Sequence, residues 1–161
     1  MRRALALLLL AAMLDGPAAA QPVPAEVAVR VVVGTREIPL DGAAFARLPV
    51  IEQEVTFASG SGPFRAVFRG VALWSALEAA GVLEGMDGRQ RIRRVLRITG
   101  RDGHEVAVAL AEIDPEYGNN PVLLAWAVDG RPLADGGLRL ALPGDSRGGR
   151  NVRDVATVAL E

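Results

Sequence analysis

The chain has 161 residues and a formal net charge of −1, with 18 basic residues, all of them arginine, against 19 acidic ones. This balance gives no electrostatic case for binding nucleic acid or a membrane surface, and the absence of lysine excludes Schiff-base and Walker-type lysine chemistry. With no cysteine and a single histidine, the chain lacks the usual ligands of a zinc, copper or haem site, so we predict no metal ligand.

Residues 1–20 are typical of a secretory signal peptide. Two arginines precede an apolar run over residues 4–14, a Gly-Pro break follows, and three alanines end the segment with the small residues that signal peptidase requires. The run is about half the length that a membrane-spanning helix needs. We therefore expect a periplasmic or secreted protein, with no membrane insertion after cleavage, a flexible leader at residues 21–26 and a folded domain over residues 27–161.

The first half of this domain predicts three strands and two helices. Residues 27–33 form a β-branched run, which favours a strand covered on both faces. Apolar and polar residues alternate over residues 50–58, with Ile51, Val55 and Phe57 on one face and glutamates on the other, as in a half-exposed strand. In chain order the remaining predictions are a short helix at 40–48 capped by Asp41, a loop at 59–63, a strand at 64–69 and a helix at 71–80 closed by Gly81.

The second half predicts a β-hairpin, a connecting segment and three further strands. The hairpin arms are residues 92–99 and 104–110, and His104 is expected to be an exposed hairpin residue. A turn-rich connection at 111–120 leads to strands at 122–128 and 138–142, which a polar turn joins, and to a last strand at 155–160. About eight strands and one well-formed helix indicate an α+β fold, a single mostly-β domain with few short helices.

Six arginines gather on and around the first arm of this hairpin. Such a run is typical of a solvated face, and the alternative is a docking face for an anionic partner. The residues are Arg89, Arg91, Arg93, Arg94, Arg97 and Arg101.

The loop that follows the strand at 138–142 is the predicted binding site. Its sequence, GDSRGGR, places Asp145, Arg147 and Arg150 among three glycines at the end of a strand pair. A rigid sheet that ends in a charged, glycine-rich loop presents polar groups to a ligand, and the glycines allow a close approach to backbone amides. The alternatives are a turn-capping role for Asp145, a solvent-facing Arg147, and an ion pair of Arg153 with Asp154 or Glu161.

Several ordered motifs resemble the sulfite-oxidase-type, molybdopterin-binding oxidoreductase domain. Residues 68–73, followed by a short helix to residues 80–82, are similar to its "F-x-G-V-x-L…AG" entry segment. Residues 149–153 (GRNVR) look like its closing "G-x-R-x-V-K/R". The motifs that stand between these two in the family's order and spacing lie at residues 122–125, 129–133, 137–140 and 142–144.

The resemblance implies a sulfite-oxidase-like fold and a pterin ligand. In the catalytic family members a cysteine thiolate ligates molybdenum, and this chain has no cysteine. Molybdenum and a covalent cofactor are therefore not expected. Short exported relatives without the cysteine resemble periplasmic pterin-binding proteins that regulate a membrane cyclic-di-GMP enzyme. The alternatives are a molybdopterin-dependent oxidoreductase and a degenerate enzyme fold that acts as a protein-interaction module.

A pterin ring needs a carboxylate for its paired N–H donors, a guanidinium or backbone N–H for O4, and an apolar or aromatic wall for its face. Aromatic candidates for the wall are Tyr117, in the connecting segment, and Trp126, for which core packing is the alternative. No general acid–base pair or nucleophile is indicated, so no catalytic residue is predicted. The predicted ligand-binding set is Asp145, Arg147, Arg150, Tyr117, Trp126 and Arg153, in which the ligand role of Arg150 is implied by the resemblance to the closing motif of the family.

Overall fold

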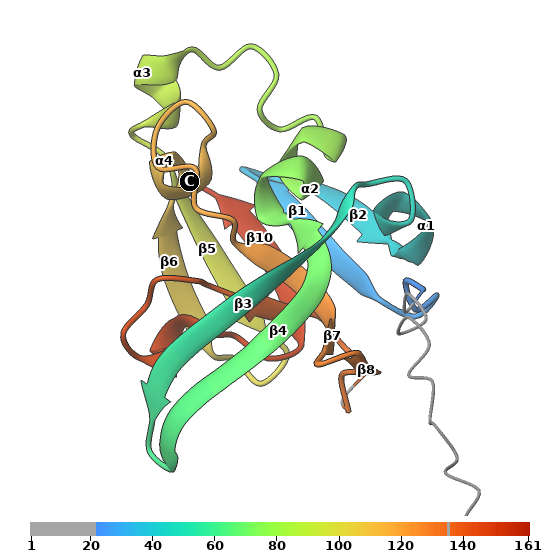
Figure 1. Cartoon of the computed structure of the whole chain (residues 1–161). Helices are drawn as coiled ribbons and strands as arrows, with labels where there is room; N and C mark the ends of the chain where they lie inside the picture. The colour runs from blue at the N-terminus through green and yellow to red at the C-terminus, as the bar shows by residue number, and fades with distance from the viewer. Residues whose placement is uncertain (1–21, 135) are drawn as a thin grey trace, which may run out of the picture.

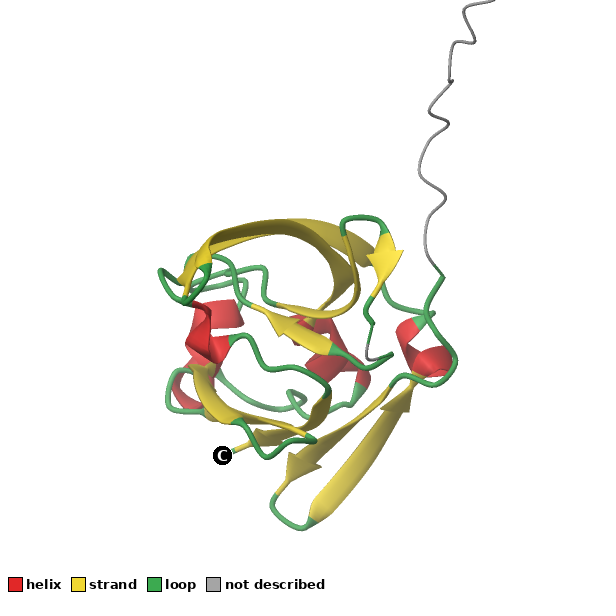
Figure 2. Cartoon of the chain, turned by 90° about the horizontal axis from the view of Figure 1, so that it is seen from below, coloured by secondary structure: helices red, strands yellow, loops and turns green. Residues whose placement is uncertain are grey.

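The computed structural model describes residues 22–134 and 136–161, so the expected signal peptide lies outside the described residues. None of the described helices is long and apolar enough to cross a membrane. The described residues form two five-stranded sheets, and their strands curve around a common interior (Figures 1 and 2). Strands dominate and the helices are short, which confirms the predicted mostly-β architecture.

The first sheet has the strand order β2-β1-β10-β5-β6. The strands β1 and β10 pair in parallel, with Val31 opposite Val158. The predicted hairpin is confirmed, because β5 and β6 pair antiparallel with Leu96 opposite Val108, but its first arm begins at Val95 and not at Ile92. The strands are β1 (Ala28–Val33), β2 (Arg36–Asp41), β5 (Val95–Gly100), β6 (Glu105–Ala109) and β10 (Val155–Leu160).

Two predictions for the start of the domain are corrected. In β1, Val29 and Val31 are buried while Ala28 and Arg30 are exposed, because one face of this sheet packs on the core and the other meets solvent. The strand β2 was not predicted. It pairs with β1 in a hairpin that turns at Gly34 (φ +58°) and forms the edge of the sheet, where Pro39 is tolerated.

The second sheet has the order β3-β4-β7-β8, and β9 pairs with β7 on its other side. A tight turn at Gly60 replaces the loop predicted at 59–63, so β3 and β4 form one long hairpin (Figure 1). The predicted pairing of the two late strands is confirmed, with Leu124 opposite Leu140. The strands are β3 (Val50–Ser59), β4 (Gly62–Ala72), β7 (Leu123–Val128), β8 (Arg131–Pro132) and β9 (Arg139–Ala141).

The helices are shorter than predicted. The helix predicted at 71–80 is α2 (Leu73–Ala79), because Val71 and Ala72 still belong to β4, and the left-handed Gly81 (φ +66°) follows it as expected. The helix predicted at 40–48 is the single turn α1 (Gly42–Phe45), and the Asp41 carboxylate accepts a hydrogen bond from Ala44 N at 2.9 Å. The unpredicted short helices are α3 (Gly88–Arg91), α4 (Leu110–Ile113) and the 3₁₀ turn η1 (Gly148–Arg150).

The strand β7 lies between two hydrophobic clusters and is buried on both faces. Leu124 and Trp126 face the main core, which also receives residues from the first sheet and from α2. Leu123 and Ala125 face a smaller cluster that includes Phe68 of β4. The space next to Ala125 is therefore filled by the protein's own side chains.

Candidate functional site

The charged loop after β9 packs along the outer edge of β3. Ala58 N donates a hydrogen bond to Ser146 O at 3.0 Å, and Ala58 and Arg147 form an isolated parallel bridge. Gly148 lies against the ring of Phe57, so closely that a Cβ on this glycine would stand 2.5 Å from a ring carbon. The loop therefore has a defined position against the hairpin and does not extend into solvent.

This contact creates a groove with a volume of about 460 Å³, which is in the range of small-molecule sites. One side is the β3 segment that contains Phe57, and the other side is the loop and the start of β9. Three guanidinium groups line the groove, from Arg139, Arg147 and Arg153. Phe57 also lines a second hollow of about 540 Å³, where it stacks on Phe64 at a ring-centroid distance of 4.5 Å.

Asn151 lines the groove and carries an unused hydrogen-bond donor. Its Oδ1 accepts a hydrogen bond from Leu142 N at 3.4 Å, which fixes the orientation of the side-chain amide. Its Nδ2 is buried and has no hydrogen-bond partner among the described residues. Buried polar groups are nearly always satisfied in folded proteins, so an amide donor of this kind indicates a place where a ligand atom or water accepts.

Arg150 forms an ion-pair cluster with two carboxylates beside the groove. Its Nε and Nη2 donate to the two carboxylate oxygens of Asp145 at 2.9 and 2.6 Å, and its Nη1 lies 3.3 Å from an oxygen of Glu112. The hydrogen bonds that Arg150 donates to Asp145 raise the pKa of Arg150, and the negative charges of both carboxylates add to that shift against the effect of burial. The bidentate pair joins the two ends of the loop and leaves little of Arg150 for a ligand.

The structure brings together some of the predicted residues and separates others. Arg147 and Arg153 lie in the groove, Asp145 lines the neighbouring hollow, and Arg150 holds the loop closed. Tyr117 is 48% exposed and lies beside α3, while Trp126 is 2% exposed and belongs to the main core. Neither aromatic residue lines the groove.

The groove residues that were missed include Phe57, Arg139 and Asn151. The alternation of apolar and polar residues in β3 predicts the face of the strand on which Phe57 lies. No local signal in the sequence shows that this strand packs against a loop so distant in the chain. His104 is exposed, as predicted, and its Nε2 lies 2.9 Å from Gly149 O, which ties the hairpin of the first sheet to the same loop.

Comparison with known proteins shows the fold. No protein-family profile and no curated protein matches the chain. Among solved structures, the sulfane dehydrogenase SoxCD from Paracoccus pantotrophus superimposes with a TM-score of 0.65 at 15% sequence identity, over 84% of this chain. The chain spans 38% of the length of that dehydrogenase chain. This likeness supports the expected sulfite-oxidase-like fold and does not extend to function.

Proposed function

We propose that this protein is a non-catalytic pterin-binding protein, and that the ring binds in the groove between Phe57 and the loop after β9. The observation that carries this proposal is the buried Nδ2 of Asn151, which has no hydrogen-bond partner among the described residues and belongs to a residue that lines the same groove as Arg147 and Arg153. A groove that combines amide and guanidinium donors with an aromatic wall is complementary to a flat heterocycle that carries acceptors on its edge.

The donors fit the acceptor edge of a pterin. Its O4 and ring nitrogens accept hydrogen bonds, and the Asn151 amide with the two loop guanidiniums supplies N–H groups at this place. Phe57 provides an apolar surface for the ring face. Asp145, next to the groove, keeps acceptor capacity for the 2-amino group because an ionised carboxylate can accept more hydrogen bonds than Arg150 donates.

The residues do not fit a thiolate-ligated molybdenum centre. The chain contains no cysteine, so no protein thiolate is available to the metal. We therefore propose that binding, without oxygen-atom transfer, is the function of the groove. In this proposal the protein acts in the periplasm as a sensor or accessory, and its partner is the periplasmic domain of a membrane cyclic-di-GMP enzyme.

Ligand binding is tested by calorimetry under anaerobic conditions with tetrahydrobiopterin as the probe. We expect saturable binding, and we expect Asn151→Asp to weaken it about tenfold or more, because this change removes the Nδ2 donor and keeps the oxygen that accepts from Leu142. Asn119→Asp, at an exposed loop position, is the matched control and should bind as the unmodified protein does. Absence of heat and of a thermal shift, or undiminished binding by the Asn151 variant, would overturn the proposal.

Export is tested separately by fractionation of a Gram-negative host that expresses the full chain. We expect the protein in the periplasmic fraction, with a mass that corresponds to cleavage after Ala20. Recovery of the uncleaved chain in the cytoplasm would contradict the export part of the proposal and would leave the binding test untouched.

A further inference from the structure

The six arginines around the first hairpin arm fall into two groups. Three are already held in ion pairs within the chain. These pairs are Arg91 with Asp114 (3.0 Å) and Glu116 (2.5 Å), Arg97 with Glu105 (2.7 Å) and Glu161 (2.8 Å), and Arg101 with Asp154 (3.1 Å).

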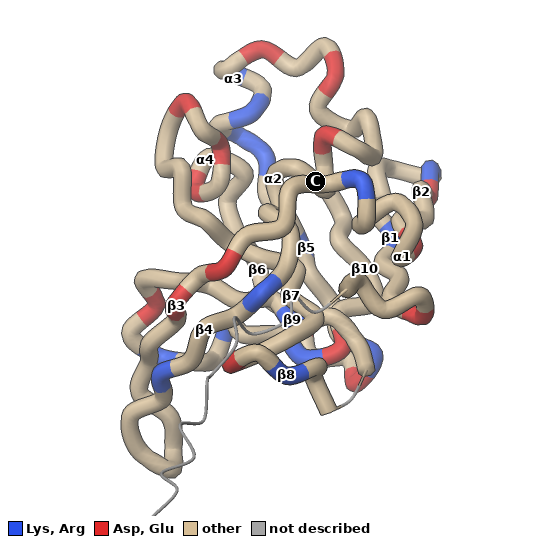
Figure 3. The backbone as a smooth tube through the Cα atoms, turned by 45° about the vertical axis from the view of Figure 1, so that its right-hand side comes forward, with Lys and Arg blue, Asp and Glu red and all other residues tan. Residues whose placement is uncertain are grey.

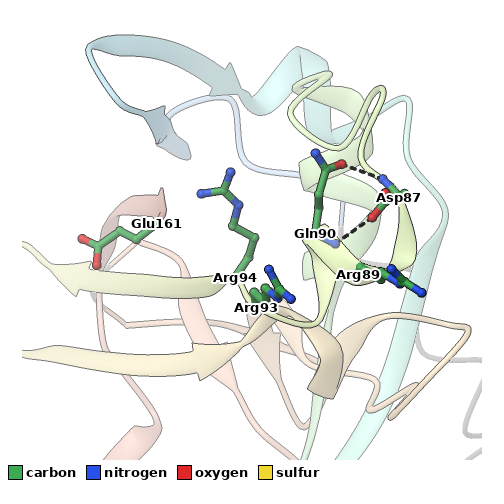
Figure 4. Close-up of a pocket in the computed structure, with 6 residues that line it drawn as sticks. All are labelled: Asp87, Arg89, Gln90, Arg93, Arg94 and Glu161. Carbon is green, nitrogen blue, oxygen red and sulfur yellow. Dashed lines mark hydrogen bonds between the residues drawn. The ribbon is translucent and has the colours of Figure 1, made fainter.

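The other three, Arg89, Arg93 and Arg94, are exposed and have no ion-pair partner among the described residues. They line one hollow of about 530 Å³, and Arg94 extends between Gln90 and Glu161 (Figure 4). Figure 3 shows, in blue, basic residues in α3 and in the chain that follows it. Two carboxylates also line the hollow, those of Asp87 and Glu161. Glu161 is already paired with Arg97, so the three guanidiniums give the hollow a net positive charge.

Contacts of the neighbouring residues Asp87, Gln90 and Arg91 hold the backbone that carries these arginines in place. Asp87 and Gln90 form a capping box at α3, with two hydrogen bonds of 2.8 Å. Arg91 reaches inward to Asp114, which is 0% exposed, and its guanidinium carbon lies 5.9 Å from the centroid of the Trp74 ring. The free guanidiniums therefore project from a preorganised turn, which lowers the entropic cost of binding.

Apolar side chains are exposed around the same turn. Ile92 is 49% exposed, Val95 is 37% exposed, and Tyr117 is 48% exposed with its hydroxyl group against Gly88. Few other large apolar residues of the described chain are this exposed. Arginine and tyrosine beside exposed aliphatic groups are typical of the residues that dominate protein–protein interfaces. A small free anion would use the guanidiniums but would leave the apolar groups uncovered.

We propose that this α3 surface, made of Arg89, Ile92, Arg93, Arg94, Val95 and Tyr117, docks an acidic segment of another protein that carries an apolar anchor. The carboxylates of the partner pair with the three unpaired guanidiniums, and its apolar side chain covers Ile92 and Val95. The surface shares no residue with the groove at Phe57, so the inference does not depend on pterin binding.

The probe is a displayed library of random peptides of about twelve residues, selected on the immobilised full chain. We expect enrichment of peptides that combine several Asp or Glu residues with one large apolar residue. The strongest peptide, measured by fluorescence anisotropy, should lose affinity about tenfold or more in the Arg89→Glu, Arg93→Glu, Arg94→Glu variant and about threefold in Ile92→Ser. Its affinity should also fall as salt rises from about 50 to about 300 mM.

The matched control reverses three arginines elsewhere, Arg36→Glu, Arg47→Glu and Arg131→Glu. These are also exposed and without an ion pair among the described residues, and the substitution changes the net charge by the same amount. The control should bind the peptide within about twofold of the unmodified protein. Equal losses in both variants, selection of peptides without acidic residues, peptide displacement by millimolar inorganic phosphate, or self-association of the chain through this surface would overturn the proposal.

Discussion

The guanidinium of Arg150 holds the carboxylate of Asp145 in a bidentate pair, with donor–acceptor distances of 2.9 and 2.6 Å. The two residues stand at opposite ends of the loop after β9, so the pair closes the loop against β3. Asp145 and Arg150 were both predicted as ligand-binding residues. Because they pair with each other, their first role is to hold the loop in its conformation. Substitutions of these two residues are therefore expected to affect stability, whereas substitution of Arg147 is expected to affect ligand binding.

We expect Arg150→Ala to lower the free energy of unfolding by about 1–2 kcal/mol, because it leaves the carboxylate of Asp145, 16% exposed, without its partner. Arg147→Ala should leave stability unchanged within about 0.5 kcal/mol, because this side chain is exposed. We expect Arg147→Ala to weaken the binding of tetrahydrobiopterin, because it removes a guanidinium that lines the groove. Urea unfolding and calorimetry on both variants measure the difference, and a stability loss in Arg147→Ala equal to that in Arg150→Ala would contradict this assignment.

The contact between Gly148 and Phe57 gives a second prediction. Gly148→Ala places a Cβ 2.5 Å from the Phe57 ring, so either the ring or the loop must shift. We expect a stability loss of about 1–2 kcal/mol, together with weaker tetrahydrobiopterin binding. Gly149→Ala is the control, since a Cβ there meets no atom within 4 Å. Denaturation curves that coincide for the two alanine variants would show that the loop does not rest on Phe57.

The buried carboxylate of Asp114 is predicted to matter more for stability than its exposed neighbour. Both Asp114 and Glu116 pair with Arg91, but Asp114 is fully buried and the side chain of Glu116 is 67% exposed. Asp114→Asn should cost about 2–4 kcal/mol, because Arg91 is 15% exposed and loses its buried counter-charge. Glu116→Gln should cost less than about 1 kcal/mol. Equal shifts of the urea midpoint would contradict this ranking.

Glu161 gives a prediction for acid stability. Hydrogen bonds from Arg97, with its positive charge, hold the pKa of Glu161 below its ordinary value, against partial desolvation. A carboxyl group whose pKa is lower in the folded state stabilises the fold at neutral pH, and this contribution is lost as the pH falls below about 4.5 and through the folded-state pKa. The melting temperature of Glu161→Gln should therefore fall less steeply between about pH 5 and 3 than that of the unmodified protein.

The control for this titration is Glu84→Gln, which removes an exposed carboxylate that has no ion-pair partner among the described residues. Its melting temperature should follow that of the unmodified protein over the same pH range. The Glu161 effect is expected to be small, because both members of the Arg97 pair are about half exposed. A steeper acid loss in Glu161→Gln would contradict the sign of the effect.

The sequence predicted the strands of this fold better than its helices. Alternation and β-branched runs are local signals, so the boundaries of β10 were predicted correctly and those of β7 within a residue. The edge strand β2 was missed because Pro39 and its charged neighbours suit a loop equally well. The helix α2 starts late because Gly70 lies so close to the backbone of Leu124 and Ala125 that β4 continues past it.

Only the loop of the candidate site could be predicted, because local patterns are visible in a sequence and long-range contacts are not. A glycine-rich loop with Asp145 and Arg147 is a recognisable local pattern. The aromatic wall is not, because Phe57 joins the loop through the long-range hydrogen bond between Ala58 and Ser146. Tyr117 and Trp126 were predicted from their aromatic rings and their places in the chain, and burial in the main core places Trp126 away from the groove. Which aromatic residue faces a site depends on strand pairing, which a single sequence shows only weakly.

The position of β10 has a consequence for how this chain reaches its native state. The strand lies between β1 and β5, so the first sheet stays in two separate hairpins until residues 155–160 have been synthesised. Such a topology cannot complete its folding while the ribosome still holds these residues, and a frameshift shortly before them would leave both hairpins with a bare edge prone to aggregation.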